Sequence, residues 1–91
     1  PHPTIFIDTI SFNLFEYLLK NIGQGHLDIS FIYRAMYADK FIHKDSESGF
    51  RRWFEAEYHI SFNSKLQTNP HAASKYRKSI YSMALNQFQL K

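Results

Sequence analysis

The sequence contains no cysteine among its 91 residues, which excludes a disulfide framework and a thiolate metal site. It has no apolar run near the roughly 18 residues that a transmembrane helix needs. Its start also lacks the basic segment, apolar segment and small-residue cleavage site of a signal peptide. We therefore expect a cytoplasmic protein that does not span a membrane.

Glycine and proline are scarce, with three of each, and 44% of the residues are hydrophobic. This composition is sufficient for a real core even in a domain of this size. We expect one helical domain over residues 1–91. Because the chain begins Pro1-His2-Pro3 without an initiator methionine, we interpret it as the C-terminal part of a longer protein or as a trimmed form.

Acidic residues are absent from the last third of the chain. All eight Asp and Glu lie within residues 1–57, together with six of the eleven Lys and Arg, whereas residues 58–91 hold five Lys or Arg. A one-sided positive charge of this kind fits an anionic partner, either nucleic acid or an acidic protein surface.

Residues 29–54 are predicted to form the centre of the domain as a helix, a corner and a second helix. Apolar residues recur there at three- and four-residue steps, which is the spacing of one helix face. They are Ile29, Ile32, Tyr33, Met36 and Tyr37 before the corner, and Phe50, Trp53, Phe54 and Tyr58 after it. Phe41-Ile42 between them predicts a short extended piece that returns the chain to its core. Trp53 is predicted to be a core residue.

Two further helices complete a predicted all-α domain of four helices with one or two short extended segments. Residues 1–7 are predicted to be extended, and a first helix is expected from a Ser11 cap, ending at Gly23. The second helix is expected to be capped by Asp28 and to end near Ala38. Ser46 or Ser48 is expected to cap the third, which ends near His59.

The last helix is predicted to begin at Asn69-Pro70 and to end near Phe88. Its spacing predicts an inner side flanked by Tyr81, Leu85 and Phe88, with Lys75 and Lys78 facing outward. That inner side comprises Ala73, Tyr76, Ile80, Met83, Ala84 and Gln87.

The sequence offers no catalytic constellation, so we expect a protein that is not an enzyme and uses no cofactor. The five histidines are His2, His26, His43, His59 and His71, and none are spaced as paired metal ligands. We predict no metal site.

Basic and aromatic residues interleave in residues 75–81, KYRKSIY. This combination provides backbone attraction and base stacking in single-strand binders, although Tyr76 also fits the inner side of the helix. Arg51 and Arg52 lie where a recognition helix usually carries base contacts, but Glu47, Glu55 and Glu57 share that helix and repel phosphates.

The order of these segments resembles the C-terminal region of the RteC family of conjugative-element regulators and related uncharacterised mobile-element proteins. The runs that carry the resemblance are FIYRAMYADKFIH, GFRRWFEAEYHISF and KYRKSIYSMA, within residues 12–84. The resemblance implies a winged-helix-like domain that binds DNA in transcription regulation. Phe41-Ile42-His43 would then be the corner, Arg51 and Arg52 would lie on the recognition helix, and Tyr76-Arg77 would match the late basic segment.

Two functional hypotheses follow. The first is a nucleic-acid-binding regulatory domain with a helix-turn-helix-like core, whose contact residues would be Arg51, Arg52, Lys65, Lys75, Arg77 and Lys78. The second is a protein-interaction module that docks an acidic partner or another part of a longer parent chain. A single continuous positive face would favour DNA, whereas a separate exposed apolar patch would favour protein docking.

Overall fold

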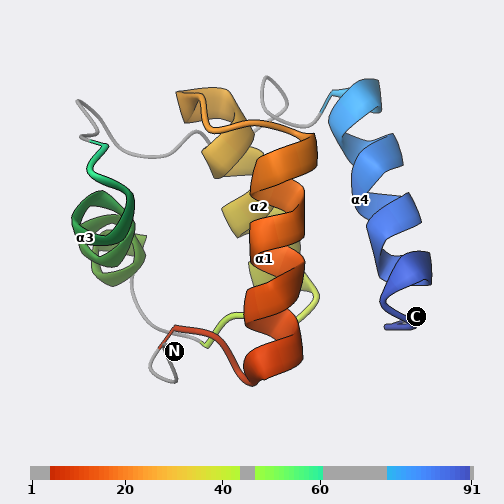
Figure 1. Cartoon of the computed structure of the whole chain (residues 1–91), viewed down its shortest axis with the longest axis horizontal. Helices are drawn as coiled ribbons and strands as arrows, with labels where there is room; N and C mark the ends of the chain where they lie inside the picture. Colours follow the sequence, from red (N-terminus) through yellow and green to blue (C-terminus); the bar gives the residue numbers. More distant parts are fainter. Residues whose placement is uncertain (1–4, 44–46, 61–73, 91) are drawn as a thin grey trace.

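The computed structural model describes residues 5–43, 47–60 and 74–90, and these contain four α-helices. The helices are α1 (Thr9–Asn21), α2 (His26–Ala38), α3 (Glu47–Tyr58) and α4 (Lys75–Gln87). The predicted all-α class is confirmed. Figure 1 shows α1 and α2 in the middle of the molecule, with α3 on one side of them and α4 on the other. No second strand pair that would form a wing occurs within these three ranges.

α1 begins earlier than the sequence pattern predicted. Asp8 is its N-cap, and the Asp8 carboxylate accepts a hydrogen bond from the Ser11 backbone N–H at 2.8 Å. Ser11 itself is buried inside the first turn. The prediction of Ser11 as the cap was therefore wrong, because the helix begins at Thr9 and Ser11 occupies its third position, where its own N–H is the group that the cap satisfies.

α2 is also capped differently from the prediction. Gly25 is the N-cap, and its backbone N–H donates to the Asp28 carboxylate at 3.0 Å. Asp28 thus caps from inside the first turn, as the acidic member of a capping box does.

Gly23 directly follows Ile22, the C-cap of α1. Gly23 has φ +137°, and a Cβ atom there would lie 2.5 Å from the Asp28 carboxylate. Glycine is required at this position for both reasons.

The C-terminus of α2 is closed by a Schellman motif with lysine where glycine is usual. The Phe41 N–H donates to the Met36 carbonyl at 2.9 Å and the Lys40 N–H donates to the Tyr37 carbonyl at 3.1 Å. Lys40 accordingly has φ 67°, in the left-handed region. In this conformation a residue with a Cβ atom destabilises the fold by roughly 1 kcal/mol relative to glycine.

α4 ends in the same motif. The Leu90 N–H donates to the Leu85 carbonyl at 2.9 Å, the Gln89 N–H donates to the Asn86 carbonyl at 3.1 Å, and Gln89 has φ 57°. α2 and α4 therefore both end in this motif with a left-handed residue that is not glycine.

The predicted corner after α2 is an extended piece, as expected. Phe6 and Ile42 form an isolated antiparallel bridge, with hydrogen bonds from the Ile7 N–H to the Phe41 carbonyl and from the His43 N–H to the Ile5 carbonyl. Phe6 and Ile42 are both buried. The bridge therefore fixes the N-terminal segment and the corner together over the core.

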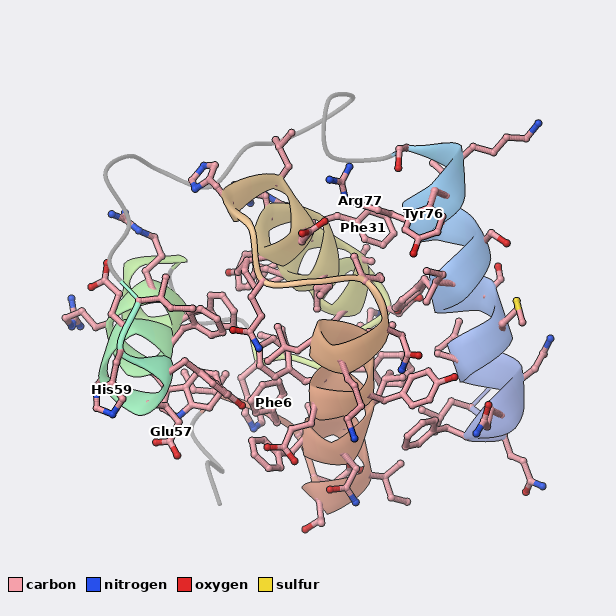
Figure 2. The ribbon with its side chains drawn as sticks, turned by 45° about the horizontal axis from the view of Figure 1, so that its top comes forward. Phe6, Phe31, Glu57, His59, Tyr76 and Arg77 are labelled. Carbon is pink, nitrogen blue, oxygen red and sulfur yellow. The ribbon has the colours of Figure 1, made fainter. Side chains whose placement is uncertain are left out.

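Aromatic rings connect α3 to α1. The Phe15 ring, which is fully buried on α1, lies 5.8 Å from Phe50, 5.6 Å from Trp53 and 6.1 Å from Phe54, measured between centroids. The Phe6 ring contacts Phe15 and Trp53 from the N-terminal segment, and Figure 2 shows it between α1 and α3. Such tilted and edge-to-face pairs add to the burial of area.

The α3 predictions are mixed. Trp53 is half-buried and packs against the core cluster. α3 begins at Glu47, so Ser48 is not its cap, and Ser46 lies outside the described residues. Its end agrees with the prediction, and His59 follows it with φ 58°.

We predict that Trp53→Ala lowers the free energy of unfolding by about 3 kcal/mol, because it removes a large side chain from the ring cluster. Chemical denaturation with Met83→Ala, an exposed position, as the control measures this difference. Equal midpoints for the two variants would show that α3 does not depend on Trp53 for its attachment.

Candidate binding surface

The cations of α3 are only partly available to a partner. Arg52 is exposed, but Arg51 is half-buried and its Nε atom is shielded from solvent. Glu55 and Glu57 follow within the next two turns of the same helix, and Glu57 is exposed. α3 therefore presents mixed charge, and Arg52 is its more accessible guanidinium group.

The N-terminus of α4 lies later in the chain than predicted. Ser74 is the N-cap, and its hydroxyl accepts a hydrogen bond from the Arg77 backbone N–H at 3.2 Å. Ser74 has an extended backbone, so α4 does not continue back to Asn69-Pro70 as the sequence predicted. Asn69 and Pro70 lie outside the described residues.

Arg77 connects α4 to the start of α2. Its Nε donates to the Asp28 carboxylate at 2.9 Å, and the side chains are only 18% and 22% exposed. Figure 2 shows Arg77 at the beginning of α4 on the side of α2. This guanidinium, predicted to contact phosphate, is instead occupied by a carboxylate of its own chain.

Tyr81 makes a second connection, to the end of α2. Its hydroxyl donates to the Asp39 carboxylate at 2.6 Å and lies 3.3 Å from the Ala35 carbonyl oxygen. Its ring packs edge-on against Phe31 at 6.0 Å. Burial, followed by the hydrogen bond to Asp39, raises the pKa of the Tyr81 hydroxyl well above its ordinary value.

These two connections fix the rotation of α4 about its own axis. Tyr81, Ala84 and Leu85 are buried, whereas Tyr76 is 64% exposed and Met83 is 65% exposed. The prediction that Tyr76 and Met83 form the inner side was wrong. Gln87 is also exposed, although its side-chain oxygen accepts from the Tyr17 hydroxyl at 3.3 Å. Ala73 lies outside the described residues.

The outward side of α4 combines apolar and basic groups. Tyr76, Ile80 and Met83 lie four and three residues apart, so they share one stripe on which Ile80 is half-buried. Lys75 and Lys78 are also exposed, about 100° and about 160° around the helix from Tyr76 respectively, and the helix contains no acidic residue. We call these five residues the outer face of α4.

The five predicted contact residues that the structure describes do not form one surface. Arg51 and Arg52 lie on α3 and Lys75 and Lys78 on α4, and Figure 1 shows the α1–α2 pair between those two helices. Arg77 is paired with Asp28. Lys65 lies outside the described residues.

Met83 was the surface residue that sequence reasoning missed. A signal for it existed: positions 77, 81, 84, 85 and 88 also have helical spacing. That stripe contains an arginine, which made it look less apolar than the alternative that includes Met83. An arginine buries its aliphatic stem readily when a carboxylate receives its head group.

In residues 5–43, 47–60 and 74–90, no group of three or more His, Asp or Glu is arranged to hold a metal ion. None of the helices there has both the length and the apolarity of a membrane span. Comparisons with family models, with curated proteins and with solved structures each find no match for this chain.

We predict that Asp28 and Arg77 stabilise the fold together. A double-mutant cycle with Asp28→Asn and Arg77→Met should give a coupling free energy of about 1 kcal/mol, because the pair is mostly shielded from water but not deeply buried. Urea denaturation of the four proteins measures it. A coupling free energy of zero would mean that the ion pair does not fix the rotation of α4.

We also predict a loss of stability at alkaline pH. Because the pKa of Tyr81 is higher in the folded than in the unfolded chain, its contribution is complete below pH 10 and is lost as the pH rises above that value. Tyr58 acts in the same direction, since burial and then the neighbouring Glu16 and Glu57 raise its pKa to about 12.

Between pH 10 and 12, the unfolding free energy of the parent protein should fall as the pH rises. In Tyr81→Phe the slope of this fall should be smaller, by up to about 1.4 kcal/mol per pH unit. Denaturation at a series of pH values measures the slope. Identical slopes for the variant and the parent protein would contradict the assignment to Tyr81.

Proposed function

We propose that this domain is a protein-interaction module and that the outer face of α4 docks an acidic amphipathic helix. The observation that supports the proposal is the exposure of Tyr76 and Met83, each about two-thirds accessible, on one stripe of α4. Large apolar side chains that recur along one helix face are typical of helix-in-groove and helix-pair recognition.

The charge of α4 specifies the chemistry of the partner. Lys75 lies about 100° around the helix from Tyr76, and no acidic residue follows Glu57 in the entire sequence. A partner helix with Leu or Phe on one face and Glu or Asp along its edges would place a carboxylate opposite the ammonium group of Lys75, while Lys78 adds positive charge further round the helix. The lysines would mainly increase the association rate and set the orientation, while Tyr76 and Met83 would provide buried contact area.

Nucleic-acid binding is the second candidate, supported by the exposure of Tyr76 next to Lys75. An exposed aromatic ring beside a lysine suits base stacking on a single strand. Duplex recognition through Arg51 and Arg52, as implied by the RteC resemblance, remains a prediction. We rank it lower because Arg51 is half-buried and because the cations of α4 lie on the opposite side of the molecule.

The proposal is tested with three fluorescent probes: an 18-residue amphipathic helical peptide carrying leucine and glutamate, a single-stranded oligothymidine and a DNA duplex. Fluorescence anisotropy should show binding of the acidic peptide. Tyr76→Ala/Met83→Ala should weaken that binding at least tenfold. Ile10→Ala is the matched control, because Ile10 is an exposed apolar residue on α1 at 49% exposure.

The lysines distinguish the candidates further. If oligothymidine binds while the acidic peptide does not, and Tyr76→Ala weakens that binding, the nucleic-acid candidate replaces the docking proposal. In that case Lys75→Gln/Lys78→Gln should reduce the slope of log K against log salt by about 0.7 for each lost contact. Binding of none of the three probes at about 50 mM salt would contradict both candidates.

A further inference from the structure

A groove lies beside the bridge between the N-terminal segment and the corner after α2. Its volume is about 510 Å³, and it is lined by Ile7, Tyr37, Ala38, Lys40, Ile42 and His43. Ile7 is 46% exposed and Tyr37 is 39% exposed, so the groove offers accessible apolar surface. None of these residues belongs to α4, and the inference is independent of the function proposed above.

The main chain at this groove includes the isolated bridge between Phe6 and Ile42, of which Ile42 is 6% exposed. In the Phe6–Ile42 bridge, the hydrogen bonds run between the residues on either side, namely Ile7 to Phe41 and His43 to Ile5. This is the non-hydrogen-bonded type of antiparallel pair, in which the N–H and C=O groups of the two central residues point away from each other. The Ile42 N–H and C=O groups make no hydrogen bond in the part of the chain that the structure describes.

Lys40 occupies a costly backbone conformation at the rim of this groove. Its φ of 67° is one that glycine adopts more readily. Non-glycine residues held in the left-handed region concentrate at binding sites, where the side chain has a use that offsets the strain. The ammonium group of Lys40 is the chemical feature that glycine would lack.

The charge of the lining is positive or neutral. Lys40 and His43 are its titratable members besides Tyr37, and no Asp or Glu lines the groove. Asp39, the nearest acid in sequence, accepts a hydrogen bond from the Tyr81 hydroxyl on α4. The groove thus combines apolar side chains, an ammonium group and the main-chain groups of Ile42, which have no hydrogen-bond partner among the described residues.

We infer that this groove binds an extended peptide that pairs with Ile42 as an added β-strand and places a carboxylate against Lys40. In such β-strand addition, main-chain hydrogen bonds provide affinity and alternate side chains provide specificity. The peptide would present apolar side chains to Ile7 and Tyr37 and an Asp or Glu toward Lys40.

The probe is a random heptapeptide library displayed on phage and selected against the intact 91-residue chain. The selected peptides should alternate apolar residues with at least one Asp or Glu. A fluorescent selected peptide should bind the parent protein and should bind Lys40→Gly and Lys40→Asn at least tenfold more weakly. Both substitutions remove the ammonium group while tolerating a positive φ.

Gln89→Gly is the matched control, because Gln89 occupies the same position of the same helix-end motif in α4. Lys40→Gly and Gln89→Gly should both raise the thermal midpoint, but only Lys40→Gly should weaken peptide binding. Hydrogen exchange at the Ile42 amide should slow at least tenfold when the peptide binds.

Equal affinity of the selected peptide for the parent protein and Lys40→Gly would overturn the inference. So would unchanged exchange at Ile42, or the absence of acidic residues among the selected peptides. Binding that is lost in Tyr76→Ala/Met83→Ala but kept in Lys40→Gly would assign the peptide to the outer face of α4, supporting the proposed function and refuting the groove.

Discussion

Two aspartates of α2 determine how the last helix is presented to a partner. Asp28, in the first turn of α2, receives the Arg77 guanidinium, and Asp39, at its C-cap, receives the Tyr81 hydroxyl. Arg77 and Tyr81 are one turn apart on α4, so the two contacts constrain both its position and its rotation. The same rotation that buries Tyr81 exposes Tyr76 and Met83.

The opposite side of the molecule is assembled by a different interaction. α3 is joined to α1 through Phe15 and its neighbouring rings, a contact that depends on shape and apolar area more than on directional polar groups. Because α1 and α2 lie between α3 and α4, the cations of these two helices cannot be treated as one surface. This separation is the reason for ranking protein docking above duplex recognition.

Much of the fold was predictable from the sequence because apolar spacing records which residues are buried. The periodicity around Ile29 and Met36 located α2, and Phe41-Ile42 correctly indicated an extended return to the core. Helix starts were less predictable, since Asp8 and Ser11 are both good caps and only the tertiary structure decides which N–H groups need a partner.

The candidate site was less predictable than the fold. Arg77 was predicted to contact nucleic acid, but it has a carboxylate partner 49 residues away in sequence, a distance that local patterns do not report. Because Arg77 faces α2 to reach Asp28, Tyr76 and Met83 lie on a different side of α4 and are exposed to solvent. A single long-range ion pair therefore changes which residues of α4 are available for binding.

The rotation of α4 determines which of its residues are exposed, and the two methionines of the chain report it directly. Met36 is fully buried and Met83 is 65% exposed, so dilute hydrogen peroxide should convert Met83 to the sulfoxide much faster than Met36. Peptide mass spectrometry over a time course measures both rates in the same folded sample. Rapid oxidation of Met83 with protection of Met36 is the predicted result, and equal protection of both methionines would contradict the observed rotation.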